Sequence, residues 1–147
     1  GIDWCLLGYL KMASGGGSNK APFQSVGESF VAHYYQNFDT NRANLAPLYR
    51  DNSMLSFEGE QFMGIQPIIQ KLVSLPFQKV VHQIVTCDCQ PVLASQPNGI
   101  LVFVSGNLVV DDSPNPMKFS QTFNLLSDPS NPNSYFVHND LFRLNYG

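Results

Sequence analysis

The stretch from Met54 to Ile84 constrains the fold more than any other part of the chain, because its periodicity changes twice. A strand pattern, a tight turn, a helix pattern and a second strand pattern follow one another. Residues 55–57 alternate as a half-buried strand does, and Gly59 supplies a residue that readily adopts positive φ. We therefore expect a hairpin with Glu58 and Glu60 at its tip.

An amphipathic helix follows this hairpin. Pro67 stands where the start of a helix tolerates proline, and the Leu75-Pro76 pair ends the helical pattern. The apolar positions recur at helical spacing, at Ile65, Ile68, Ile69 and Leu72. This spacing predicts a helix that lies with one face against a sheet.

Two helices are predicted before this block. The first spans residues 23–38, with Ser25 as its expected N-terminal cap. A short second helix begins at Arg42, and Asp39 is interpreted as a capping carboxylate between the two. The first helix carries one apolar stripe, formed by Phe23, Val26, Phe30, Tyr34 and Phe38.

Four β-rich runs follow, at residues 79–90, 100–110, 117–127 and 134–144. Their apolar residues occupy both faces, which an antiparallel sheet with one solvated face does not show. The helices can cover one face, and a second copy of the chain is the natural cover for the other. We expect an α+β domain that forms a homodimer through Leu101, Phe103 and Leu141.

Composition excludes several classes of function. Charged residues make up 13% of the 147 residues and the net charge is −3, so no basic stripe is available for nucleic acid. Three cysteines (Cys5, Cys87 and Cys89) form an odd set without a second ligand pair, so we predict no metal and no cofactor. No apolar stretch is long enough to span a membrane.

Residues 1–21 are expected to lie outside the domain. The segment includes the run Ala13-Ser14-Gly15-Gly16-Gly17-Ser18, which is typical of a flexible linker. We interpret residues 1–21 as a leader and linker that extend the chain, and residues 22–147 as one domain.

Four runs carry a family resemblance: SFVAHYYQNFDTNR, FEGEQF, LPFQK and NDLFRL. In these runs the chain resembles the nuclear transport factor 2 family from about Phe23 to Gly147. The resemblance implies a cone-shaped fold in which a curved antiparallel sheet wraps a long N-terminal helix. It also implies a carrier, not an enzyme, that binds the GDP form of the GTPase Ran and moves between cytoplasm and nucleus.

The resemblance further implies the binding residues. An apolar cavity that receives an aromatic residue of Ran is expected at the open end of the cone, with Glu58 and Asp111 as rim carboxylates and His82 nearby. Phe23 matches the position that binds Phe-x-Phe-Gly repeats of nuclear pore proteins. The expected cavity residues are Phe57, Leu75, Phe77, Val80, Leu108, Val110, Met117 and Phe142.

Two alternatives remain open from the sequence. The same fold houses isomerases and dehydratases, for which His138 and Asp140 are the best candidates, because they alternate with Phe136 and Phe142 and all four could share the cavity face. The second alternative is a subunit of an mRNA-export heterodimer.

Overall fold

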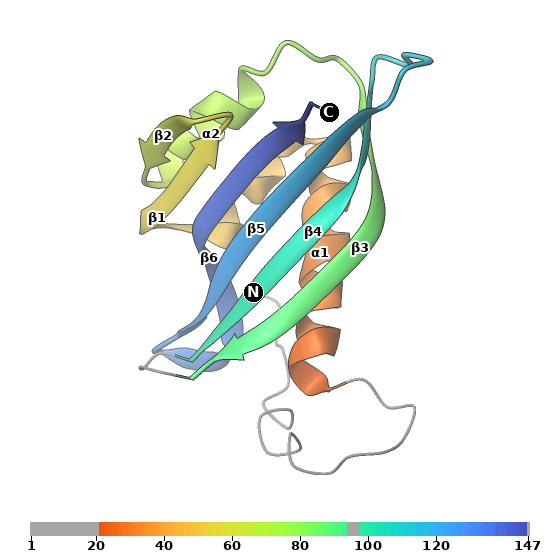
Figure 1. The fold of residues 1–147 in the computed structure, drawn as a ribbon. Coiled ribbons are helices and arrows are strands. Elements are labelled where there is room, and N and C mark those ends of the chain that lie inside the picture. The colour runs from red at the N-terminus through yellow and green to blue at the C-terminus, as the bar shows by residue number, and fades with distance from the viewer. Residues whose placement is uncertain (1–20, 94–97, 147) are drawn as a thin grey trace.

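A long helix lies against one face of a curved sheet in the computed structural model of the chain (Figure 1). The structure describes residues 21–93 and 98–146. The predicted leader, residues 1–21, lies outside the described residues except for Ala21. The α+β class and the predicted fold are confirmed, and the sheet is open rather than closed into a barrel.

Helix α1 spans Pro22–Thr40 and packs its predicted apolar stripe against the sheet. Phe30, Tyr34 and Phe38 are buried. The prediction that Ser25 caps this helix is wrong, because the helix begins at Pro22, whose restricted φ suits a first helical position. Gly27 allows α1 to approach the sheet, since a Cβ at this position would collide with the Cys89 sulfur.

One short helix and a hairpin follow α1. The 3-10 helix η2 spans Arg42–Leu48, and the Asn41 side chain accepts a hydrogen bond from its first turn. Strands β1 (Tyr49–Phe57) and β2 (Glu60–Met63) form the predicted hairpin. Both of its turn residues have positive φ, 52° at Glu58 and 87° at Gly59, as in a type I′ turn.

Helix α2 spans Ile65–Val73 and is followed by the last four strands. These are β3 (Val80–Val92), β4 (Gly99–Val110), β5 (Met117–Asp128) and β6 (Asn131–Asn145). The strand order is β2-β1-β6-β5-β4-β3. One pair differs from the expected antiparallel sheet: β1 and β6 run parallel, so the first long strand pairs with the last.

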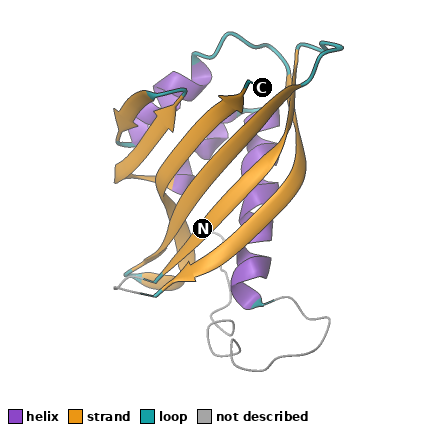
Figure 2. Cartoon of the chain, viewed as in Figure 1, coloured by secondary structure: helices purple, strands orange, loops and turns teal. Residues whose placement is uncertain are grey.

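In the part of the chain that the structure describes, helices cover only one face of the sheet. Figure 2 shows α1, η2 and α2 behind the strands, and the opposite face, which we call the outer face, turned toward the viewer. At one end of the sheet the α2–β3 loop, the β4–β5 turn and the end of β6 come together (Figure 1). We call this end the open end.

Candidate functional site

A line of aromatic rings crosses the open end from β1 to β3. The Phe57 and Phe142 rings stack with centroids 4.6 Å apart, and Phe142 in turn stacks on Phe119 at 5.8 Å. Phe119 meets the His82 ring at 5.2 Å. These contacts link β1, β6, β5 and β3 in one continuous row of rings, in which Phe119 and Phe142 are buried and Phe57 is half-buried.

Four further predicted cavity residues adjoin this line through strand pairing, and Leu75 and Phe77 belong to the loop between α2 and β3. Val80 pairs with Val110, and Leu108 pairs with both His82 and Met117. We name the complete predicted set the open-end cluster: Phe57, Leu75, Phe77, Val80, Leu108, Val110, Met117 and Phe142.

Burial varies within the open-end cluster. Leu75, Val80, Leu108 and Phe142 are buried, whereas the other four members are half-buried and pack against the core. The cluster thus has a buried base and a partly exposed apolar surface. Burial of one large apolar side chain of a partner on such a surface can contribute roughly 1.5–3 kcal/mol to the free energy of binding.

Glu58 is fixed at the edge of this cluster by the backbone of β6. The Leu144 N–H donates to Glu58 Oε1, and the Glu58 N–H donates to the Phe142 carbonyl at 3.1 Å. No hydrogen bond within residues 21–93 and 98–146 occupies the second carboxylate oxygen, Oε2. The carboxylate is therefore held in one orientation with an oxygen left for a partner.

Asp111 is held in the same manner on the other side of the cluster. Its Oδ1 accepts hydrogen bonds from the N–H groups of Gln78, at 3.0 Å, and Lys79, at 2.8 Å. Its own N–H donates to the Lys79 carbonyl at 2.8 Å. Asp111 has a φ of 50°, which ordinary residues avoid, so these bonds stabilise a strained turn.

The two neighbouring carboxylates are paired with lysines instead. Glu60 lies 3.3 Å from the Lys71 ammonium, and Asp112 lies 2.8 Å from that of Lys79. Lys71 also stands over the Phe57 ring, with its ammonium 5.6 Å from the ring centroid. Glu58 and Asp111 therefore differ from their neighbours in having no cation within ion-pair distance in the described part of the chain.

His82 is a buried support of the open-end cluster. Its side chain is 2% exposed, and its Nδ1 lies 2.6 Å from Asp39 Oδ1. The His82 backbone N–H donates to Asp39 Oδ2 at 3.0 Å. The interpretation of Asp39 as a helix cap is therefore wrong, because its carboxylate ties the end of α1 to β3. A role of His82 in binding would be indirect, through its neighbour Leu108.

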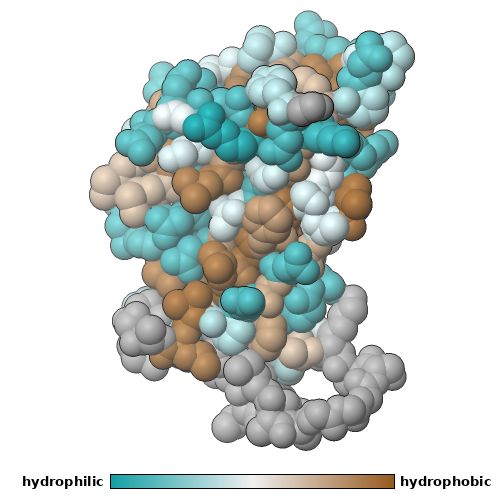
Figure 3. Space-filling model, in the orientation of Figure 1, coloured by the Kyte–Doolittle hydropathy of each residue, from teal (hydrophilic) through white to brown (hydrophobic). Residues whose placement is uncertain are grey.

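The outer face carries large exposed apolar side chains. Leu101, Phe103 and Leu141 are 40%, 44% and 52% exposed. They lie in two adjacent rows of strand-paired residues, Leu101 with Asn124 and Asn139, and Phe103 with Thr122 and Leu141. Figure 3 shows hydrophobic surface distributed over this side of the molecule.

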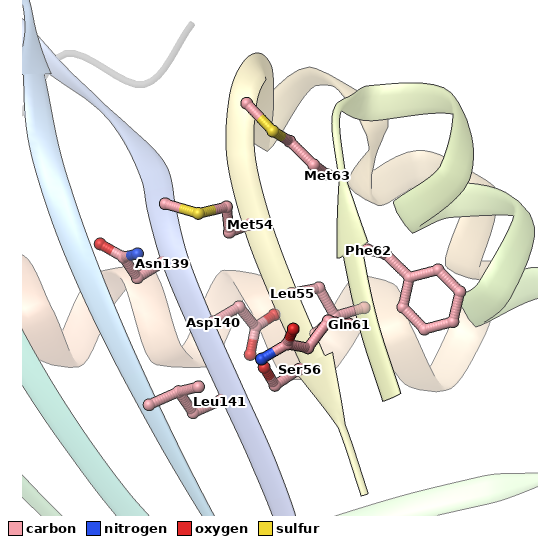
Figure 4. A pocket seen from close by; sticks show the side chains of 9 residues that line it. All are labelled: Met54, Leu55, Ser56, Gln61, Phe62, Met63, Asn139, Asp140 and Leu141. Atoms are coloured by element: carbon pink, nitrogen blue, oxygen red, sulfur yellow. The ribbon is translucent and has the colours of Figure 1, made fainter. Parts of the chain in front are cut away.

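A groove of about 390 Å³ adjoins these residues on the outer face. Met54, Met63 and Leu141 border it, and Phe62 points away from the other side chains toward α2 (Figure 4). Met54 and Met63 are 41% and 61% exposed and were not singled out from the sequence. The signal for Met54 was present in the alternation of β1, where Leu55 faces the core and its neighbours face outward.

Phe23 lies in the first turn of α1, at the opposite end of this helix from the open end. Its side chain is half-buried and packs against the core cluster. The nearby Gln24 side chain donates to the Cys87 carbonyl at 3.0 Å, so this turn is tied to β3.

The candidate catalytic residues do not form a catalytic pair. Asp140 is 1% exposed and accepts hydrogen bonds from Tyr49, at 2.8 Å, and Gln121, at 2.7 Å, with Tyr34 at 3.4 Å. Burial raises the pKa of Asp140 to about 6, against the opposing effect of these hydrogen bonds.

His138 lies at a bulge and departs from the predicted alternation. Asn139 pairs with Asn124, but Val137 pairs with Leu125, which leaves His138 as an extra residue in β6. The bulge brings Val137 into the core and sets Phe136 beside the His138 ring, at 6.4 Å. The expectation that Phe136 and His138 share one face with Asp140 and Phe142 is therefore wrong.

A family model described as the Nuclear transport factor 2 (NTF2) domain matches residues 26–144. The chain belongs to the nuclear transport factor 2 family. It is 56% identical over 126 residues to nuclear transport factor 2 of Emericella nidulans, covering 86% of this chain and 98% of that protein. The predicted resemblance is confirmed.

A solved structure agrees with this assignment to the nuclear transport factor 2 family. Nuclear transport factor 2 from Cryptosporidium parvum superposes with a TM-score of 0.76 at 47% identity, covering 84% of this chain and 94% of that one. A putative scytalone dehydratase from Novosphingobium aromaticivorans (TM-score 0.61) and the Candida albicans Mtr2-Mex67 M domain complex (0.63) are only 12% and 19% identical. These two likenesses show the fold alone.

Sequence reasoning missed the polar groups that organise this site. Arg42, Lys71 and Asp39 make contacts with the open-end cluster or its supports. In the sequence, Arg42 and Lys71 looked like ordinary helix-surface residues and Asp39 like a helix cap. In residues 21–93 and 98–146, no group of three or more His, Cys, Asp or Glu side chains could hold a metal ion. None of the helices in these ranges is long and apolar enough to cross a membrane.

Proposed function

We propose that this protein is a nuclear transport carrier that binds the GDP form of Ran at the open end. One observation supports this most directly: an apolar cluster with a buried base lies between two carboxylates that the backbone holds in place. The relatives at about half sequence identity are nuclear transport factors, which supports the same class of function.

The open-end cluster fits an inserted aromatic side chain. Phe57 and Phe142 are stacked with an angle of 7° between their planes, so their edges and faces offer aromatic contacts. The partly exposed members can cover a ring that enters between them. This contact would supply affinity without any charged group.

Selectivity would come from Glu58 and Asp111. Each is fixed by backbone N–H groups, so little side-chain entropy is lost when a partner's lysine or arginine binds. A carboxylate with no competing lysine is also a better acceptor than Glu60 or Asp112, which are already paired. The geometry favours a partner with an aromatic residue flanked by basic ones.

The outer face supports a homodimer. Leu101, Phe103 and Leu141 together form an exposed apolar surface that a single weakly charged chain would leave in water. The groove beside Leu141 is concave and needs a protruding apolar side chain to fill it. A second copy, which presents the same Phe103, can supply one in an isologous interface.

Binding of Phe-x-Phe-Gly repeats is assigned to Phe23. It is half-buried, so part of its ring is available to a repeat, and it belongs to a different end of α1 from the open end. Separate sites would allow the carrier to bind pore proteins and Ran at once, and to work in both cytoplasm and nucleus.

The interior of the fold favours a carrier over an enzyme. Asp140 lines the outer-face groove but is only 1% exposed, and Tyr49, Gln121 and Tyr34 use its hydrogen-bonding capacity. His138 is separated from it by the bulge in β6. No observation gives comparable support to an isomerase, a dehydratase or an mRNA-export subunit.

Calorimetric titration of the purified protein with Ran tests the proposal. Ran loaded with GDP should bind with one Ran per subunit, and Ran loaded with GTP should bind far more weakly. Equal binding of the two nucleotide forms, or no binding of either, would refute the assignment.

A further inference from the structure

The α2–β3 loop, residues 74–79, supplies Leu75 and Phe77 to the open-end cluster but has no regular secondary structure. Its shape must therefore depend on groups outside the loop. Two side chains from other parts of the chain make these contacts, and they act on different atoms of the loop.

Arg42 binds the carbonyl groups. Its Nη2 donates to the Leu75 carbonyl at 3.4 Å and to the Phe77 carbonyl at 3.3 Å. The same guanidinium lies 5.8 Å from the Phe77 ring centroid and 5.9 Å from that of Phe38. One planar cation thus contacts both the backbone and an aromatic side chain of the loop.

Asp111 binds the amide groups. The N–H groups of Gln78 and Lys79 donate to its Oδ1 at 3.0 and 2.8 Å. The loop is therefore held through its carbonyl groups by a cation and through its amide groups by an anion. Asp111 serves as a proposed partner-binding group as well, whereas Arg42 contacts the cluster through the Leu75 and Phe77 carbonyl groups and the Phe77 ring.

The position of Arg42 is itself fixed. It is the first residue of η2, directly after Asn41, whose side chain accepts a hydrogen bond from Ala43. Two residues before Asn41, Asp39 is bonded to His82 of β3. The end of α1 thus provides a rigid base from which the guanidinium reaches the loop.

We propose that Arg42 is a positioning residue that holds the α2–β3 loop in the conformation required for partner binding. This inference rests on the proposed binding of Ran-GDP at the open-end cluster. Arg42 acts through the loop, by keeping Leu75 and Phe77 in place before the partner arrives. Preorganisation of this kind raises affinity because less order has to be created on binding.

The test compares Arg42→Met and Arg42→Lys with the parent in two measurements. Hydrogen exchange of the Gln78 and Lys79 amides reports the order of the loop, and calorimetric titration with Ran-GDP reports binding. In Arg42→Met both amides should exchange roughly 10- to 100-fold faster, and affinity should fall by a similar factor, the size expected for one or two lost charge-assisted hydrogen bonds. Arg42→Lys should not restore either, because an ammonium lacks the planar guanidinium face that lies over the Phe38 and Phe77 rings.

Arg50→Met is the matched control. Arg50 also stacks on a ring, with its guanidinium 5.3 Å from the Phe136 centroid, and also donates to backbone carbonyls, those of Pro47 and Tyr49. It lies away from the loop, so its replacement should change neither the exchange of Gln78 and Lys79 nor the affinity for Ran-GDP.

The outcomes separate the two proposals. Unchanged amide exchange in Arg42→Met, or faster exchange with unaltered Ran-GDP affinity, would overturn the positioning role, as would complete rescue by Arg42→Lys. If the parent itself does not bind Ran-GDP, the proposed function fails, and with it the binding role of Arg42. The exchange measurement would then still decide whether Arg42 orders the loop.

Discussion

The backbone N–H of Leu144 donates a hydrogen bond to the carboxylate of Glu58, which joins the tip of the β1–β2 hairpin to the last strand. Glu58 is half-buried as a result. The residue therefore has a structural contact and a proposed binding role, and a useful substitution must separate the two.

Glu58→Gln should weaken Ran-GDP binding without unfolding the domain. The amide oxygen can still accept from Leu144, but the negative charge is lost. Removal of one member of a desolvated charge pair costs about 2–5 kcal/mol, so calorimetry should show at least a roughly 30-fold loss of affinity. Glu58→Lys should lose affinity further and also destabilise the fold by about 1–3 kcal/mol, because the Leu144 N–H loses its acceptor.

Glu60→Gln is the control for this prediction. Its carboxylate lies at the same turn but is already paired with Lys71, so its replacement should reduce affinity much less than Glu58→Gln does. Comparable affinities for the parent and Glu58→Gln would remove Glu58 from the binding site.

Leu141→Glu should convert the proposed homodimer into monomers or aggregates, because it buries a charge in the apolar contact. Sedimentation velocity measures the oligomeric state directly. Val73→Glu is the control, since Val73 is 50% exposed, close to the 52% of Leu141, but belongs to α2 on the helical side of the sheet. An intact dimer in Leu141→Glu would place the interface on another surface.

Phe23→Ala should weaken binding of a Phe-x-Phe-Gly peptide severalfold while Ran-GDP affinity stays nearly unchanged. Phe77→Ala should show the reverse, because Phe77 is a half-buried aromatic of the open-end cluster. Fluorescence anisotropy with a labelled peptide, paired with Ran titration, distinguishes the two. Equal peptide binding by Phe23→Ala and the parent would exclude Phe23 from the repeat site.

Asp140 should make the fold more stable in mild acid. Its pKa is raised to about 6 from an ordinary 3.8, mainly by burial, so the folded state binds the proton more tightly than the unfolded state does. The stabilising contribution is complete below pH 3.8 and is lost as the pH rises through about 6. The shift corresponds to about 3 kcal/mol.

The measurement is the free energy of unfolding of the parent and of Asp140→Asn from urea titrations between pH 4 and 7. Comparison of the two proteins removes the contribution of other titrating groups. The stability of the parent relative to Asp140→Asn should fall across this range as pH rises. A constant difference would show that Asp140 does not titrate there.

The sequence predicted the helices and strands better than it predicted which strands pair with each other. Apolar spacing correctly predicted both α-helices and the four strands from β3 to β6, because burial of one face leaves a local periodic pattern. Strand β1 was predicted only over residues 55–57 but spans Tyr49–Phe57. The parallel pairing of β1 with β6 has no such pattern, since period-two alternation is the same for either direction. The bulge at His138 likewise shifts the alternation without any residue type that announces it.

The candidate site was likewise predicted only in part: its residues were identified, but the contacts that hold them were not. Phe57, Phe142 and the carboxylates could be selected from the family resemblance, but their restraints could not. Glu58 is held by a backbone amide of Leu144, and backbone amides carry no sequence signal. Asp39 looked like a cap because its position after α1 is local information, whereas its bond to His82 is a long-range contact.

The pairing of β1 with β6 also bears on the synthesis of the chain. The hairpin is complete once Met63 has emerged from the ribosome, but its neighbour in the sheet begins only at Asn131. Until then β1 has an unpaired edge, and Glu58 lacks its contact with Leu144. The proposed binding surface is therefore assembled last, so an unfinished chain should neither capture Ran nor compete with finished carriers for it.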